Sequence, residues 1–327
     1  MIQTSPPSLP AARGLTLFTR FLAGAVVFLL LAGAMVTSTG SGLSVPDWPL
    51  SFGQLMPPMK GGVFYEHGHR MIATAVGALT VLLALWIHRV ERRAWVRRLG
   101  WTALGLVILQ GLLGGATVLL RLPVWTSAAH ACLAQGFFLV VVFLAMVLSP
   151  GWSERDPSLP ARSRLPLLAT GATVVIYLQL ILGAVTRHLH AALVIPDFPL
   201  AMGGLAPSVW TPEIAVHYAH RVGAFLVFVA VIVSATSALR LPPSHASLRK
   251  PAAAMLVLVI VQILLGGSIV WTQRQVAVAS AHVVVGALLL AVSLALTVRS
   301  RRFQAARGNE AAALRPSLTV AGGKVTA

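Results

Sequence analysis

Eight apolar runs, each of about 20 residues, constrain this chain more than any other feature of its sequence. They lie near residues 19–38, 68–88, 100–120, 126–148, 166–186, 216–239, 251–272 and 277–298. A helix rises about 1.5 Å per residue, so each run can cross the roughly 30 Å of hydrocarbon in a bilayer. Backbone groups find no water in lipid, and the alternating pattern of a membrane barrel is absent from the sequence. We therefore predict an all-α protein with eight transmembrane helices.

The distribution of charge decides between a nucleic acid and a membrane as the partner of this basic chain. The net charge is +17, but 57% of the residues are apolar and the charges lie in short segments between the runs. We therefore predict membrane lipid as the surroundings and no nucleic-acid partner. Six of the 25 basic residues fall at the end of the runs joined by the odd-numbered loops: Lys60, Arg70, Arg121, Arg187, Arg221 and Arg274. The positive-inside rule then predicts cytoplasmic N- and C-termini and outward-facing odd-numbered loops.

The sequence contains an internal repeat, whose two copies are offset by about 150 residues. Pro46-Asp47-Trp48-Pro49-Leu50 returns as Pro196-Asp197-Phe198-Pro199-Leu200, His69-Arg70 as His220-Arg221, Gln110 to Gly115 as Gln262 to Gly267, and His130 as His282. Each half holds four spans, an even number, so both copies have the same orientation in the membrane. We predict two tandem, pseudo-symmetric four-helix bundles side by side.

The repeat also predicts the organisation of the chain. We expect a cytoplasmic tail at 1–14, an N-terminal bundle at 15–148, a cytoplasmic linker at 149–165, a C-terminal bundle at 166–298 and a second cytoplasmic tail at 299–327. Residues 1–14 and about 303–327 are expected to be disordered. The first span could also be a cleavable signal peptide, but the repeat supplies an uncleaved counterpart in the second half.

Four histidines obey the repeat and carry the predicted chemistry: His69 and His130 in the first half, His220 and His282 in the second. Each lies at the outer end of the second or fourth span of its half. Two imidazoles on different helices at one depth could hold an iron porphyrin from both faces. Three other histidines, His67, His188 and His190, do not follow the repeat and are predicted as polar loop residues.

Residues beside these histidines have structural and functional interpretations that both remain open. Arg70 and Arg221 directly follow a histidine, so each could bind a haem propionate or extend to the membrane surface. The Pro-Asp-aromatic-Pro loops are predicted to fold over the bundle mouths, with Asp47 and Asp197 capping their own backbone. The glycine pairs at 114–115 and 266–267 predict close helix packing.

The two halves differ at one informative position. Glu66 lies one helical turn before His69, whereas His217 holds the corresponding place before His220. A carboxylate in one half only suggests that the first site alone performs acid–base or cation-stabilising chemistry. Glu66 could instead favour the positive end of the helix macrodipole. Its spacing from His69 also fits a di-iron carboxylate site, but the second half lacks the matching motif.

These residues resemble the haem A synthase family. The stretch from Val36 to Pro49, which contains Gly-Leu-Ser-Val-Pro-Asp-Trp-Pro, and Glu66-x-x-His69-Arg70 carry the resemblance, which extends over both halves. It implies an enzyme that oxidises a ring methyl group of haem O to the formyl group of haem A, for terminal oxidases. It also implies substrate haem at His69 and His130, a haem b cofactor at His220 and His282, and Glu66 as the important glutamate.

The resemblance further implies a location and partners. It places the chain in a bacterial inner membrane, with haem O synthase as supplier of substrate and a separate electron donor; a homo-oligomer is compatible with it. Many bacterial members have a cysteine pair in the outer loops, whereas Cys132, the single cysteine here, lies in an apolar run. A thiol–disulfide couple within this chain is therefore excluded, and the chain resembles the cysteine-less branch.

Two other functions compete with this interpretation. A di-haem b-type electron carrier, or a haem-handling protein without chemistry of its own, would use the same four histidines. It would yield haem B alone on extraction with solvent. A transporter built from repeats would use membrane histidines as proton relays and would be colourless.

Overall fold

The fold is given by a computed structural model, which describes residues 9–152, 159–160 and 162–313. Within these residues, eight helices are long and apolar enough to cross a membrane, which confirms the predicted all-α membrane class. They are α1 (Leu9–Ser38), α2 (Gly62–Val90), α3 (Ala94–Leu119), α4 (Val124–Val147), α5 (Leu165–His188), α6 (Pro212–Leu239), α7 (Ala246–Trp271) and α8 (Val276–Ala313). Short 3-10 helices form at Pro150–Trp152, Ala191–Leu193 and Pro243–His245.

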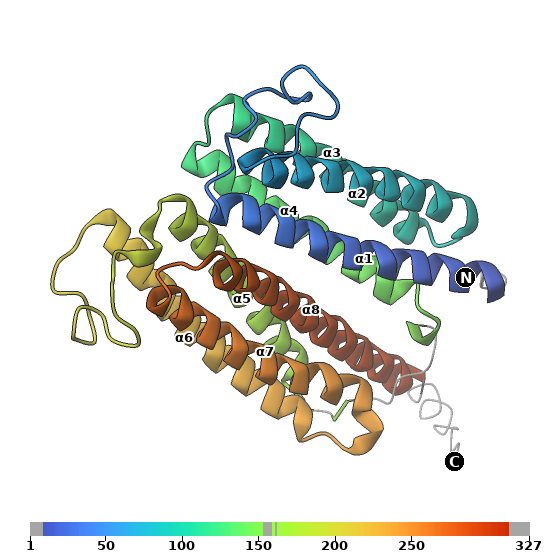
Figure 1. The fold of residues 1–327 in the computed structure, drawn as a ribbon. Helices are drawn as coiled ribbons and strands as arrows, with labels where there is room; N and C mark the ends of the chain where they lie inside the picture. Colours follow the sequence, from blue (N-terminus) through green and yellow to red (C-terminus); the bar gives the residue numbers. More distant parts are fainter. Residues whose placement is uncertain (1–8, 153–158, 161, 314–327) are drawn as a thin grey trace, which may run out of the picture.

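The long helices pack as two groups of four (Figure 1). Helices α1 to α4 contact one another in a ring, and α5 to α8 do the same. The halves meet through α1 and α4 on one side and α5 and α8 on the other. Each half has a buried apolar core of its own, with Leu22 and Val141 in the first and Ile176 and Met255 in the second. Ala287 of α8 joins the first core, so the interface between the halves is packed as well.

The loops that carry the repeated motif lie at one end of both bundles (Figure 1). These loops are residues 39–61, between α1 and α2, and residues 189–211, between α5 and α6. The start of α1 and the end of α8 lie at the opposite end. All four repeated histidines lie about two turns into α2, α4, α6 and α8 from the loop end, which is called the histidine end below.

Helix extends into both predicted tails. Helix α1 begins at Leu9 and α8 continues to Ala313, so the expectation of disorder is wrong for residues 9–14 and 303–313. Helical hydrogen bonding of α8 continues past the apolar run at 277–298. Phe303 is fully buried, and the centroid of its ring lies 5.7 Å from that of His245. The rest of the predicted tails, together with residues 153–158 and 161 of the predicted linker, lies outside the described residues.

Candidate functional site

The two long loops are closed by their own aspartates, as predicted. The Asp47 carboxylate accepts hydrogen bonds from the amides of Phe52 at 2.7 Å and Gly53 at 2.8 Å. Asp197 accepts from two amides of its own loop at the same two distances. The Gly53 amide, followed by the Phe52 amide, lowers the pKa of the Asp47 carboxyl, because both bonds favour the charged form.

Two arginines tie these loops to the helices below them. Arg70 on α2 donates from Nη1 to the carbonyl oxygens of Asp47 at 2.7 Å and Leu50 at 3.0 Å. Arg221 on α6 donates from Nη1 to the Leu200 carbonyl at 2.7 Å. The guanidinium groups therefore hold the loops over the bundles. A propionate contact by either arginine stays a prediction.

A loop aromatic ring rests on a helix glycine in each half. A Cβ on Gly115 of α3 would lie 2.6 Å from Cδ2 of Trp48, and a Cβ on Gly267 of α7 would lie 2.8 Å from the ring of Phe198. Close packing at these glycines is therefore present, but the partner is a loop side chain. Each loop is fixed at two points, the arginine and this glycine.

The structure brings the repeated histidines together in pairs. The rings of His220 and His282 have centroids 6.5 Å apart and an interplanar angle of 75°. Two metal–imidazole bonds of about 2 Å each, with the half-widths of both rings, would separate the centroids by about 6 Å, so the spacing of this pair fits two imidazoles that would hold one iron between them. His69 and His130 in the first half are close enough to interact electrostatically.

Unpartnered nitrogens at the site also fit a haem group. Within the described residues, Nδ1 of His69, His130 and His282 is buried without a hydrogen-bond partner. The same part of the chain holds no cluster of three or more His, Cys, Asp or Glu side chains that could bind a bare metal ion. Iron held by two imidazoles would therefore need a porphyrin to supply its remaining ligands.

Each of the four histidines lies against a glycine of the preceding helix. An added Cβ would lie 3.0 Å from Cε1 of His69 at Gly33, and 2.9 Å from Cε1 of His220 at Gly183. The corresponding distances are 3.0 Å for Gly114 and His130 and 3.2 Å for Gly266 and His282. The site therefore consists of four helical hairpins, each with a glycine that makes room for an imidazole. In the sequence, Gly33-Ala34 is repeated as Gly183-Ala184, and this repeat could have identified the glycines that face His69 and His220.

Three glutamines contact these histidines, and sequence reasoning did not assign them to the site. The Nε2 atom of Gln110 lies 3.3 Å from Nε2 of His130, and that of Gln262 lies 3.4 Å from Nε2 of His282. Gln179 makes the shortest contact, 2.9 Å to Nδ1 of His220, and its amide also donates to the backbone carbonyl of that residue at 2.7 Å. No such contact to His69 is present in the described part of the chain.

Glu66 is buried beside the first histidine pair. Its Oε1 accepts from Arg70 Nη2 at 2.6 Å and its Oε2 accepts from the Val45 amide at 2.8 Å. In the second half, His217 takes this place, and its Nε2 accepts from Arg221 Nε at 3.3 Å. The carboxyl group that only the first half has at this position is therefore buried and paired with a guanidinium.

The remaining histidines correct a prediction. His67 and His188 belong to α2 and α5, because both helices extend beyond the apolar runs. His67 is buried and its Nδ1 lies 2.8 Å from Ser51 Oγ. Of the three histidines expected in loops, His190 alone is in a loop, at a φ of 56°.

One arginine crosses between the halves. Arg187, at the end of α5, donates from Nη2 to the Ala34 carbonyl at 2.6 Å and to Ser38 Oγ at 2.7 Å, both on α1. Ser38 Oγ lies 3.2 Å from Ser280 Oγ of α8. A polar network therefore joins α1, α5 and α8 across the interface between the halves. The sequence marked Arg187 as a basic residue of the histidine end but not as a contact between halves.

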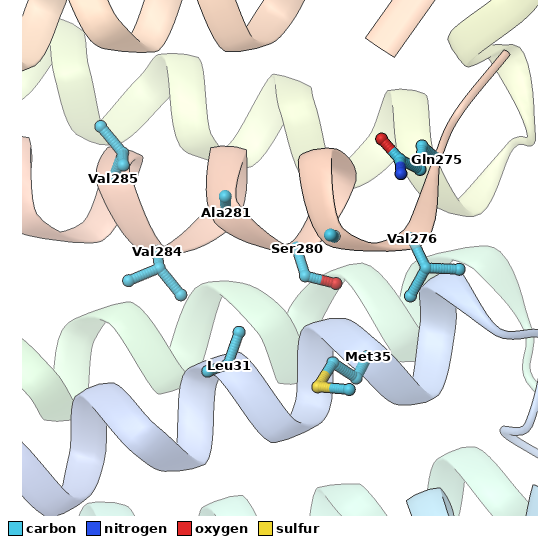
Figure 2. Close-up of a pocket in the computed structure, with 9 residues that line it drawn as sticks. Leu31, Met35, Gln275, Val276, Ser280, Ala281, Val284 and Val285 are labelled. Carbon is cyan, nitrogen blue, oxygen red and sulfur yellow. The ribbon is translucent and has the colours of Figure 1, made fainter. Parts of the chain in front are cut away.

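Two apolar hollows lie along α1. One, of about 170 Å³, is lined by His69 with residues such as Phe28 and Ile72. The other, of about 690 Å³, lies between α1 and α8 (Figure 2). Leu31 and Met35 line both, so an apolar surface runs from His69 across α1 to the second half.

Comparison with known proteins identifies the family to which this arrangement belongs. Residues 59–294 match the family described as cytochrome oxidase assembly protein. A protein named haem A synthase from Symbiobacterium thermophilum is 35% identical over 258 residues, which cover 75% of this chain and 82% of that protein. Proteins of the same name from Alkalihalophilus pseudofirmus and Geobacillus kaustophilus are 27% and 28% identical, over 84% and 89% of this chain and 93% of each relative. The chain therefore belongs to the cytochrome oxidase assembly protein family, in agreement with the resemblance found in its sequence.

Proposed function

We propose that this chain oxidises a ring methyl group of haem O to a formyl group, which gives haem A for terminal oxidases. The observation that carries the proposal is the pairing of histidines at one end of both bundles, with a buried glutamate in one half only. Two similar haem sites, of which one has an acid beside it, suit a substrate site and an electron-transfer site.

The first half is proposed to hold the substrate between His69 and His130. An apolar hollow opens at His69, between α1 and α2. Haem O carries a long apolar substituent, and an apolar wall beside its iron ligand would accept such an edge without burying unpaired polar groups. Gly33 and Gly114 would fix the two rings in place.

The second half is proposed to hold haem b between His220 and His282. When bound, haem b supplies one-electron redox chemistry. The chain's part is to hold the two imidazoles, through Gly183 and Gly266 and through the amides of Gln179 and Gln262. Hydrogen bonds to a ligating histidine set its orientation and basicity.

Glu66 is proposed to stabilise positive charge, or to take a proton, beside the substrate. Its bonds to Arg70 and Val45 fix its carboxylate on the face of α2 that carries His69, one turn away. Haem handed over by haem O synthase and electrons from a separate donor would complete the reaction. We propose a bacterial inner membrane as its location, with the histidine end outward because most basic residues lie at the other end.

The test is pigment analysis after co-expression with a haem O supply. Wild-type protein should yield haem A, and Glu66→Ala should keep bound haem but lose haem A. Glu91→Ala is a matched control, because Glu91 is also buried and paired with an arginine, Arg93 at 2.7 Å, at the opposite end. Extraction of haem B alone from the wild type would refute the enzyme and favour an electron carrier. Normal haem A output from Glu66→Ala would refute the role of the glutamate.

A further inference from the structure

The four helical hairpins of the site share one pattern, and one of them departs from it. A glutamine stands one helical turn before the glycine that faces the histidine in three hairpins. These pairs are Gln110 with Gly114, Gln179 with Gly183, and Gln262 with Gly266. Residues one turn apart lie on the same helix face, so glycine and glutamine meet the same imidazole. In the hairpin of His69, Leu29 stands one turn before Gly33.

The departure extends to the opposite helix. A Cβ on Gly223 of α6 would overlap Oε1 of Gln179, so this glycine makes room for the amide. Counted from the repeated histidines, three residues after His220 and three after His69, the first-half counterpart of Gly223 is Ile72. Leu29 and Ile72 both pack against the apolar core of their half. Two positions that face each other therefore differ between the halves. Gln179 and Gly223 occupy them beside His220, and Leu29 and Ile72 occupy them beside His69.

The consequence for His69 is visible in its hydrogen bonding. Among the described residues no glutamine contacts its ring, and its buried Nδ1 has no partner. Each of the other three rings is contacted by a glutamine amide: His220 at Nδ1 at 2.9 Å, and His130 and His282 at Nε2 at 3.3 and 3.4 Å, with Nδ1 of these two also unpartnered. Partners of this kind fix the ring of a metal-ligating histidine, and their removal typically weakens metal binding by about 10–100-fold. A resident cofactor benefits from such a partner. A substrate that must leave as product does not.

We propose that His69 is the releasable ligand of the site, and that Leu29 and Ile72 keep it so by excluding an amide such as that of Gln179, which contacts Nδ1 of His220 in the other half. This rests on the proposed function, in which the first half binds a haem that is exchanged and the second a haem that stays. Leu29 and Ile72 are positioning residues, since they act on His69 rather than on the substrate.

The proposal is tested by exchanging the two facing residues between the halves. Leu29→Gln with Ile72→Gly introduces the amide and the space for it, and Ile72→Gly alone is the matched control with space but no amide. Gln179→Leu with Gly223→Ile is the reciprocal change. Each site is loaded with haem B alone, by working in a His220→Ala background for the first site and a His69→Ala background for the second. Release is followed as transfer of haem to excess apomyoglobin, by absorbance.

We expect haem to leave the first site of the unexchanged chain faster than the second. The introduced glutamine should slow release from the first site by about 10-fold or more relative to Ile72→Gly alone, and the reciprocal change should speed release from the second by a similar factor. Equal release rates at both sites, or a double variant no slower than its control, would overturn the proposal. Failure of the unexchanged chain to bind haem at all would instead overturn the proposed function.

Discussion

Replacing Gly183 by alanine tests the glycine–histidine contact on which the second site depends. The added Cβ would lie 2.9 Å from Cε1 of His220, whereas ordinary contact begins at 3.4 Å, so ring or helix must move by about 0.5 Å. The ring cannot move freely, because Gln179 contacts its Nδ1 at 2.9 Å and bonds the backbone carbonyl at 2.7 Å. A displacement of that size reaches the tolerance of about 0.5 Å within which binding groups must be held.

The expected magnitude follows from the cost of overpacking, about 1–3 kcal/mol. At 1.4 kcal/mol per factor of ten, the affinity of the second site for haem should fall by roughly 5- to 150-fold. The free energy of unfolding of the haem-free protein should change less, because alanine in a helix is favoured over glycine by about 1 kcal/mol. The signature of the contact is therefore weak haem binding by a stable protein.

The assay is titration with haem B in a His69→Ala background, followed by Soret absorbance. Gly171→Ala is the control, since Gly171 lies on the same helix and a Cβ there would meet nothing within 4 Å. This control gains the same helix propensity without touching His220. If both alanine variants bound haem equally tightly, Gly183 would not position the ligand, and the four-hairpin description of the site would lose its basis.

Three further changes test the loops and the interface between the halves. Gly115→Ala should displace Trp48, whose Cδ2 would lie 2.6 Å from the new Cβ. A protease should then cleave the loop of Trp48 faster, and an unchanged cleavage rate would contradict this prediction. Arg187→Gln should lower the free energy of unfolding by about 1.5–3 kcal/mol for each bond lost to α1, seen as a lower melting temperature; an unchanged melting temperature would argue against the tie between halves. Because amides lower the folded-state pKa of Asp47 below its ordinary value of 3.8, its contribution to loop stability is present above pH 3.8 and is lost as pH falls through the lowered pKa. Loop protection from an acid-active protease should therefore drop in that range, and Asp47→Asn should remove this pH dependence.

Much of the fold could be predicted, because lipid imposes a simple length on each helix. The apolar runs gave the eight spans, and the repeat gave the pairing of His220 with His282 and the aspartate caps of both loops. Contacts between side chains of different elements were harder to predict from the sequence. The sequence gives the position of Arg70 but not the path of the loop above it, so its bonds to loop carbonyls and to Glu66 could not be predicted. A propionate contact by Arg70 stays a prediction.

The glutamines show which signal was present in the sequence but not used. An amide in a membrane span has few partners, so a glutamine there usually has a specific neighbour. Gln110 and Gln262 follow the repeat, but Gln179 does not, and comparison at an offset of about 150 residues therefore passes over it. It becomes visible only when the repeating unit is taken as a single hairpin, with glutamine and glycine one turn apart on one helix and histidine on the next.

That smaller unit also explains why two departures from symmetry occur together. Glu66 and Leu29 both differ from their second-half counterparts, and both lie in the hairpin of His69. Under the proposed function, one change adds a carboxyl group beside the histidine that would bind the substrate haem, and the other removes a hydrogen bond to that histidine. In a duplicated bundle, a copy that only stores a cofactor gains from keeping every ligand fixed. A copy that oxidises its bound haem and then releases it needs a group that assists the reaction and a histidine that can let the haem go. The two changes are therefore expected in the same hairpin.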